Sequence, residues 1–261
     1  MNKLLNDSLP YITGMGYRKL CDFYVDEFEV SDFSNTFDGM NIFVKTDALD
    51  FFFENIASKI KNEYNIYSHN SDINITERYL KYIENHSFLN QWFAQNVNVS
   101  HEKLIPIPLG IANARWPHGN IQILKKIQNE NNQKKRLFYF NVNTSTNVVD
   151  RMNCIQNVSV SNEKPVDFET YLREISKSYF VISPLGNGID THRNWESIYL
   201  NSVAITVRTK MSEYFLKNKL PFHLLNNWSE FEENLFTPDY YFELMKQHDN
   251  QNNKIYLKEI I

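Results

Sequence analysis

The sequence predicts an α/β protein with two Rossmann-like domains that face a cleft. Short apolar, β-branched runs alternate with helix-like segments, and strands that alternate with helices usually form parallel sheets with helices on both faces. The alternation occurs twice, on either side of a polar and basic stretch at residues 129–136. We therefore expect a first domain over residues 1–130 and a second over residues 131–240. A C-terminal helix over residues 241–261 could cross back to the first domain.

Composition excludes several classes of protein. The net charge of the 261 residues is 27 − 31 = −4, so the basic footprint of a nucleic-acid binder is missing. Cys21 and Cys154 are too isolated for a disulfide framework or a zinc site. The N-terminus lacks the apolar stretch of a signal peptide, and no run approaches the ~18 apolar residues of a membrane span. We expect a soluble, cytoplasmic protein that does not bind nucleic acid.

In the first half, the clearest helix is predicted after Asp47, because Leu49, Phe52, Phe53 and Ile56 share one helical face. Strands are predicted at residues 41–45, 64–67 and 104–107. Helices are predicted at residues 47–61, 76–83, 86–94 and 120–130.

The second half repeats the pattern around the apolar runs Phe180–Ile182 and Val203–Val207. Strands are predicted at residues 137–141, 180–182, 203–207 and 221–225. Helices are predicted at residues 167–176, from about 190 onward, and at 209–218, 228–235 and 238–258. Ligands of open α/β sheets bind beyond the carboxyl ends of the strands. The candidate loops are therefore residues 69–72, 108–119, 141–151 and 183–193.

The loop after the 180–182 strand is the strongest candidate for a phosphate site. Gly186 and Gly188 permit positive φ and close approach of the backbone. Asp190 or Thr191 can cap the following helix, whose free N–H groups would point at an anion. The alternative is an ordinary loop between a strand and a helix.

Two charged residues follow this turn at helical spacing. Arg193 and Glu196 are three residues apart and share a helix face. Arginine can bind a phosphate through two hydrogen bonds, and a carboxylate can accept hydrogen bonds from two ribose hydroxyls. The pair therefore suits a nucleoside diphosphate, while a surface ion pair is the alternative. The polar loop with Asn141, Thr144 and Arg151 could add donors to the phosphates, or it could be a solvated turn.

Three residues are candidates for a general base that faces the cleft. His69 and Asp72 follow a first-half strand, and His118 lies in the turn Trp116-Pro117-His118-Gly119 near the domain boundary. A loop histidine can equally make a structural hydrogen bond, and the turn at His118 could be a tight structural turn that Trp116 stabilises. No HExxH, Asp-X-Asp, Walker or GxGxxG pattern is present, so we expect no metal and no cofactor.

The segment SPLGNGIDTHRNWESIYLNSVAI, residues 183–205, resembles the donor-site segment of exostosin-like glycosyltransferases of the GT-B superfamily. Weaker matching blocks occur in the expected order, so that the resemblance spans roughly residues 40–207. These blocks are His69–Asp72, Trp92–Asn96, Ile105–Asn113 with Trp116–Gly119, and Tyr139–Asn141 with Thr146, Asn147 and Arg151. The chain departs from the pattern at Leu185, Asn201 and Ala204.

The resemblance implies a GT-B fold, a metal-independent reaction and a nucleotide-sugar donor held by the second domain. Arg193 would then contact the diphosphate, Glu196 the ribose, and the 141–151 loop the phosphates. The implied donor site consists of Asn141, Thr144, Arg151, Ser183, Gly186, Asn187, Gly188, Asp190, Thr191, His192, Arg193 and Glu196.

The expected function is transfer of a sugar from a nucleoside diphosphate, in the first instance UDP, to a hydroxyl of a glycan acceptor. The first domain would hold the acceptor, and Asp72, His69 or His118 would deprotonate it. Two alternatives stay open: a sugar-nucleotide or glycan-binding protein without catalysis, and an epimerase or phosphorylase on the same fold.

Overall fold

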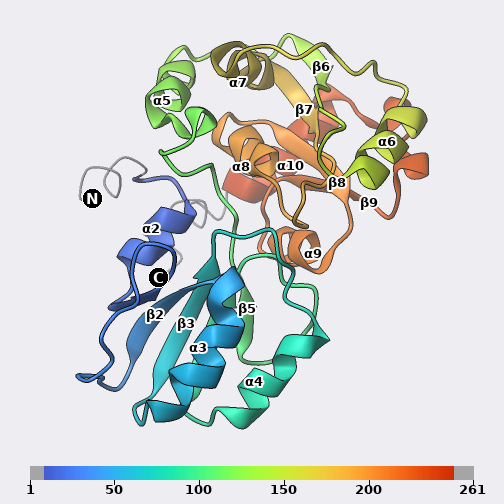
Figure 1. The fold of residues 1–261 in the computed structure, drawn as a ribbon. Coiled ribbons are helices and arrows are strands. Elements are labelled where there is room, and N and C mark those ends of the chain that lie inside the picture. The colour runs from blue at the N-terminus through green and yellow to red at the C-terminus, as the bar shows by residue number, and fades with distance from the viewer. Residues whose placement is uncertain (1–8, 250–261) are drawn as a thin grey trace.

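The computed structural model describes residues 9–249 and contains two parallel sheets, which confirms the predicted α/β class (Figure 1). The first sheet has the order β1 (Phe23–Val25), β2 (Met40–Lys45), β3 (Tyr64–His69), β4 (Leu89–Ala94) and β5 (Leu104–Pro106). The second has the order β6 (Arg136–Tyr139), β7 (Ser178–Ile182), β8 (Val203–Val207) and β9 (Phe222–Leu225).

Helices connect and cover these strands. They are α2 (Gly14–Lys19), α3 (Leu49–Asn55), α4 (Leu80–Asn85), α5 (Ile121–Asn129), α6 (Val148–Asn157), α7 (Phe168–Ser176), α8 (His192–Tyr199), α9 (Lys210–Lys217) and α10 (Pro238–Asp249). In both sheets the strands lie in sequence order, without the reversal that defines the ligand crevice of a doubly wound sheet. Neither sheet therefore forms such a crevice by itself, which directs attention to the junction between the two sheets.

Alternation along its strands gives the second sheet two buried faces, as predicted. Val181 and Ala204 belong to the same apolar cluster as residues of α7, α8 and α9. Phe180 and Ile205 point to the other face and cluster with residues of α6 and α10, such as Met245. All five residues of β8 are buried, which explains the continuous apolar run Val203–Val207.

The structure corrects four predicted elements. Residues 86–94 form no helix, because α4 ends at Asn85 and Leu89–Ala94 pair with β3 and β5 as the strand β4. Residues 228–235 form two short 3₁₀ turns instead of an α-helix. The predicted helix 47–61 is α3 flanked by two 3₁₀ turns. The 141–151 loop ends where α6 begins at Val148, and this helix, like α2 and β1, was not predicted.

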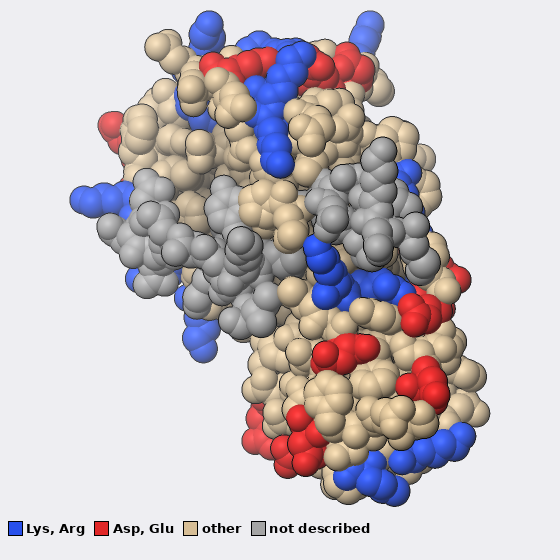
Figure 2. All heavy atoms as spheres, turned by 90° about the vertical axis from the view of Figure 1, so that its left-hand side faces the viewer, with Lys and Arg blue, Asp and Glu red and all other residues tan. Residues whose placement is uncertain are grey.

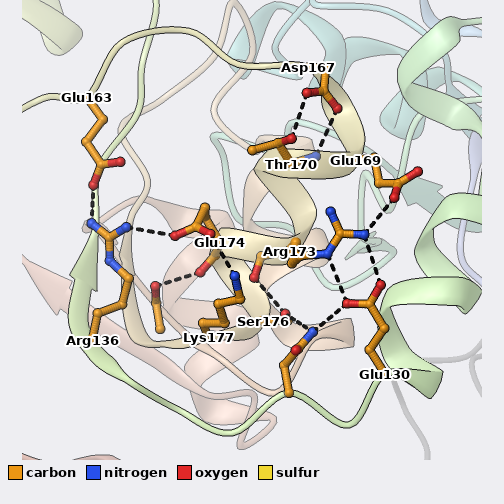
Figure 3. Close-up of polar contacts among 12 residues, drawn as sticks. Glu130, Arg136, Glu163, Asp167, Glu169, Thr170, Arg173, Glu174, Ser176 and Lys177 are labelled. Carbon is orange, nitrogen blue, oxygen red and sulfur yellow. Dashed lines mark hydrogen bonds and ion pairs between the residues drawn. The ribbon is translucent and has the colours of Figure 1, made fainter.

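The chain passes between the sheets through α5, which packs against α7 of the second sheet although the sequence assigns it to the first domain (Figure 1). Two ion pairs support this contact: Arg173 of α7 binds Glu130, which follows α5, and Lys126 of α5 binds Glu169 of α7 (Figure 3 shows the first). Arg136 of β6 is held by Glu174 of α7 and by Glu163, which lies in the segment before α7 (Figure 3). These ion pairs hold α7 against α5 and β6.

Residues 241–249 continue α10, which contacts β7 and β8 of the second sheet. The rest of the C-terminal helix expected over residues 241–261 lies outside the described residues. No helix of the described part of the chain is long and apolar enough to cross a membrane. On the face seen in Figure 2, acidic and basic side chains are interspersed, so this face carries no basic stripe of the kind that binds nucleic acid.

Candidate functional site

Loops at the carboxyl ends of the two sheets meet across the domain interface. Asn187 in the glycine turn donates to Asp72 after β3, over 3.0 Å. The amide N–H of Asp190 donates to the Asn96 side chain after β4, and the Asp190 carboxylate accepts from the N–H of Leu109 after β5, over 2.9 Å. Three of the four predicted ligand loops are thereby brought into one place.

Asp190 has a structural task at this junction. Its side chain is buried, and it accepts hydrogen bonds from Leu109 N, Trp195 Nε1, Asn194 Nδ2 and Thr191 N. Burial raises the pKa of Asp190, while these donors act against that rise. Thr191 is the N-cap residue of α8, and its side chain makes no capping hydrogen bond. Asp190 therefore holds the start of α8 against the first domain.

The glycine turn is built differently from the prediction. Neither Gly186 nor Gly188 has a positive φ, so that expectation was wrong. Gly188 is needed for close approach, since a Cβ there would lie 2.4 Å from Nδ2 of Asn96. Around Gly186 the nearest atom would be 3.7 Å away. Gly110 is the left-handed glycine of the site, with φ of 70°, and a Cβ there would collide with the carbonyl of Ile12.

The glycine turn and the start of α6 form one unit. Asn147, the left-handed N-cap of α6, donates from its amide to the carbonyl of Gly186 over 2.8 Å. The Asp150 carboxylate accepts from the N–H of Leu185, and Arg151 Nε donates to the Leu185 carbonyl over 3.1 Å. The polar loop after β6 is consequently fixed beside the loop after β7, as the sequence suggested for neighbouring parallel strands.

Two arginines converge on this unit without an acidic partner. Arg151 also donates to the carbonyl of Asn143, and Arg193 Nε donates to the hydroxyl of Tyr171 over 3.1 Å. Burial and the nearby charge of Arg193 lower the pKa of Arg151. Among residues 9–249, no carboxylate forms an ion pair with either guanidinium. Asp150 acts on Arg151 and Glu196 acts on Arg193 only as nearby charges, so both guanidiniums keep hydrogen-bond donors that an anion could take.

Glu196 is linked to Arg193 through a residue that the sequence did not reveal. The Tyr171 hydroxyl donates to Oε2 of Glu196 over 2.8 Å while it accepts from Arg193. Glu196 is 5% exposed, and burial raises its pKa to about 7, against the effects of Tyr171 and Arg193. Tyr171 lies on α7, more than twenty residues away in sequence, so no local pattern indicates its role.

The other predicted donor-site residues differ in how free they are. Ser183 is fully buried and donates to Asn194, and the Asn141 amide donates to the carbonyl of Lys164. Thr144 is partly exposed in the loop after β6. The hydrogen-bonding groups of Ser183 and Asn141 are thus engaged within the protein, and Arg151, Arg193 and Glu196 are the charged members that gather around the turn.

A cavity of about 230 Å³ lies on the first-domain side of the junction. Its walls come from the loops after β3, β4 and β5, from the start of α2 and from α8. They comprise Gly14, His69, Asn70, Ser71, Asp72, Gln95, Leu109, Ile111, Asn113, Arg115, Trp116 and His192. Of the three predicted base candidates, His69 and Asp72 line this cavity. His118 is exposed and lies beside it, with its ring 6.1 Å from that of His192.

Both ring nitrogens of His69 are occupied. Nδ1 accepts from the N–H of Asn70 over 2.7 Å, and Nε2 lies 3.1 Å from the carbonyl oxygen of Pro108, to which it donates. Burial lowers the pKa of His69 to about 4. Asp72, in contrast, is exposed and keeps one carboxylate oxygen beyond its bond to Asn187. Of the two, Asp72 is the freer group.

Within the described residues, no group of three or more His, Cys, Asp or Glu side chains is arranged to hold a metal ion. No family model matches the chain, and no curated protein matches it. The interpretation of the site consequently depends on the geometry and the chemistry of its residues.

Proposed function

We propose that the chain is a glycosyltransferase of GT-B architecture that moves a sugar from a nucleoside diphosphate, in the first instance UDP, to a hydroxyl of a glycan acceptor. The observation that carries the proposal is the pair Arg151 and Arg193, which form no direct ion pair with a carboxylate of the described residues and lie beside the glycine turn. Their combined charge suits a diphosphate, both when it is bound and when it leaves.

The surroundings of the two arginines favour a nucleotide over a free phosphate. Glu196 sits next to Arg193 through Tyr171, and its Oε2 accepts from that hydroxyl, so that the second carboxylate oxygen can accept from a ribose hydroxyl. The first domain presents a separate polar cavity across the interface. A donor site and an acceptor site on facing domains are what sugar transfer requires, and Asp72 is the freest of the three predicted bases.

Calorimetric titration of UDP tests the donor site. Arg151→Ala and Arg193→Ala should each weaken UDP binding about 10- to 100-fold, because a hydrogen bond to a charged group contributes ~1.5–3 kcal/mol. Unchanged affinity in both variants would remove the basis of the assignment. UDP binding without turnover of any donor, slow hydrolysis included, would favour a non-catalytic binding protein.

A further inference from the structure

The lining of the interdomain cavity is polar. Arg115 is paired with Glu27 over 3.0 Å, whereas Asp72 accepts from the neutral amide of Asn187 and keeps its negative charge. The remaining polar side chains of the wall include three amides, which both donate and accept hydrogen bonds and so match hydroxyl groups. These amides are Asn70, Gln95 and Asn113. The lining therefore fits a neutral, hydroxyl-rich molecule better than an anion.

The amides are held in place before any ligand binds. Asn113 Nδ2 donates to Oδ1 of Asn70 over 2.9 Å, and Gln95 Oε1 accepts from the N–H of Asn70. Gln95 Nε2 donates to the carbonyl of Ser71 over 2.8 Å. Gly14 allows α2 to lie against this group, since a Cβ there would be 1.8 Å from Oδ1 of Asn70. Such a network lowers the cost of ordering the wall on binding, and each amide nitrogen keeps a second hydrogen to donate to a hydroxyl group.

Trp116 gives the cavity an aromatic edge. Its side chain is 52% exposed, whereas the other three tryptophans are fully buried. Arg115 lies 5.6 Å from the centre of the Trp116 ring. A large exposed aromatic face beside fixed amides can pack on the apolar C–H face of a sugar ring while the amides bind its hydroxyls.

His192 contributes a ring nitrogen that is free to accept a proton. Its Nδ1 lies 2.7 Å from the carbonyl oxygen of Gly110. Because a carbonyl only accepts, Nδ1 carries the hydrogen and Nε2 carries the lone pair. Within residues 9–249 this Nε2 has no hydrogen-bond partner, in contrast to the fully engaged ring of His69.

We propose that the cavity binds the acceptor, that the acceptor is a neutral sugar, and that Nε2 of His192 takes the proton of its attacking hydroxyl. This inference rests on the proposed glycosyltransferase function and deepens it. The sequence places His192 in the donor site, whereas its position in the cavity wall assigns it to the acceptor side.

The proposed step is a displacement at the anomeric carbon of the donor sugar. The acceptor oxygen bonds to that carbon, and the bond from the carbon to the diphosphate oxygen breaks with its electron pair on the diphosphate. The hydroxyl proton moves to Nε2 of His192 and is later released to water. Arg193 follows directly in the first turn of α8, so one rigid element carries both the base and a cation for the leaving group.

The pH dependence follows from the groups that face His192. Burial lowers the pKa of His192 to about 4, and the nearby His118 lowers it further. The Gly110 carbonyl and the charge of Asp72 act in the opposite direction and raise this pKa. His69 and Arg115 line the same cavity. His192 is therefore neutral at pH 7, and the acid limb of kcat/KM should lie well below the ordinary histidine value of ~6.5.

Fluorescence quenching by acrylamide tests the acceptor site, because Trp116 is the only tryptophan with an exposed side chain. With UDP bound, methyl β-glucoside, methyl β-galactoside and N-acetylglucosamine are the neutral probes, and glucuronate is the anionic one. We expect at least one neutral sugar to protect Trp116 and glucuronate not to do so. Failure of all three neutral sugars to protect Trp116 would overturn the acceptor site.

The variant His192→Asn tests the base. Its amide nitrogen can replace Nδ1 as the donor to Gly110, but it offers no proton acceptor at the position of Nε2. With a protecting sugar as acceptor, kcat should fall about 10²- to 10⁴-fold, while the Kd for UDP stays unchanged. The matched control is His101→Asn in the loop before β5, at the opposite end of the first sheet, which should keep wild-type kcat.

Wild-type kcat in His192→Asn would overturn the role of His192. A second measurement does not depend on the variant: ¹⁵N NMR of the histidine rings at pH 7 should show hydrogen on Nδ1 and a bare Nε2 for His192, and the opposite tautomer contradicts the inference. Absence of UDP binding to the wild-type protein would instead defeat the proposed function. The two failures are thus distinguishable.

Discussion

Four arginines of the second domain form two pairs with opposite surroundings. The outer pair is Arg136 of β6 and Arg173 of α7, and each is held by two carboxylates (Figure 3). Arg151 and Arg193 lie at the glycine turn and bind only carbonyl and hydroxyl oxygens among the described residues. The first pair is neutralised by direct ion pairs, whereas the second has only the nearby charges of Asp150 and Glu196 and no direct ion pair. The difference indicates where a ligand belongs.

The largest expected effect comes from removing Arg151 and Arg193 together. The Arg151→Ala/Arg193→Ala double variant should lose at least about 100-fold in affinity for UDP, because two charge-assisted contacts contribute ~1.5–3 kcal/mol each. Competition calorimetry measures the difference. If the double variant binds UDP as tightly as the wild type, Arg151 and Arg193 contribute no more to UDP binding than the outer pair does.

Glu196 provides the next largest effect, on stability as a function of pH. Since burial raises its pKa to about 7, the folded state binds more protons than the unfolded state between about pH 4.5 and 7. The contribution of Glu196 to the free energy of unfolding therefore falls as pH rises through that window. Relative to Glu196→Gln, the wild type should lose up to about 3 kcal/mol by pH 8.

Urea denaturation of both proteins across this pH range checks the prediction. The difference between them isolates Glu196 from His69 and His192, whose lowered pKa values make stability rise with pH over about 4 to 6.5. Parallel pH curves for the two proteins would show that Glu196 is not the carboxyl that titrates near 7.

The two glycines of the turn allow a matched comparison. Gly188→Ala should lower the free energy of unfolding by about 1–3 kcal/mol, because the new Cβ overlaps the buried side chain of Asn96. Gly186→Ala should stay within about 0.5 kcal/mol, since it has room and no positive φ. Chemical denaturation measures both, and equal effects would contradict the close contact with the first domain.

The smallest effect belongs to the outer arginines. Arg136→Ala should reduce the free energy of unfolding by about 0.5–1 kcal/mol, since partly exposed ion pairs contribute little. The reduction should shrink as salt is added, and the Kd for UDP should not change. Weakened UDP binding in this variant would contradict the inference that UDP binds at Arg151 and Arg193 and not at the outer pair.

Local sequence patterns predicted most of the second sheet and its helices. The apolar run Val203–Val207 and the helix capped by Asp167 were confirmed because each signal is contained in a few neighbouring residues. The strand β4 was misassigned as part of a helix. Its buried positions are fixed by pairing with β3 and β5, which no local pattern reveals.

The site was predictable in its location but not in its internal contacts. The candidate loops at residues 69–72 and 108–119 lie at one edge of the first sheet, because the carboxyl ends of parallel strands share an edge, and loop 183–193 of the second sheet meets them across the interface. The roles of Tyr171 and Gly188 depend on partners 25 and more than 90 residues away. Such long-range contacts leave no trace in spacing or composition.

The proposed activity is transfer of a sugar from a nucleotide donor. The most direct measurement incubates the wild-type protein and Arg193→Ala with UDP-, GDP- and CMP-sugars and quantifies the nucleotide that is released. We expect the wild type to release UDP from a UDP-sugar, by transfer or slow hydrolysis, and Arg193→Ala to lose that release. Binding of UDP by the wild type without release from any donor would contradict the proposed activity.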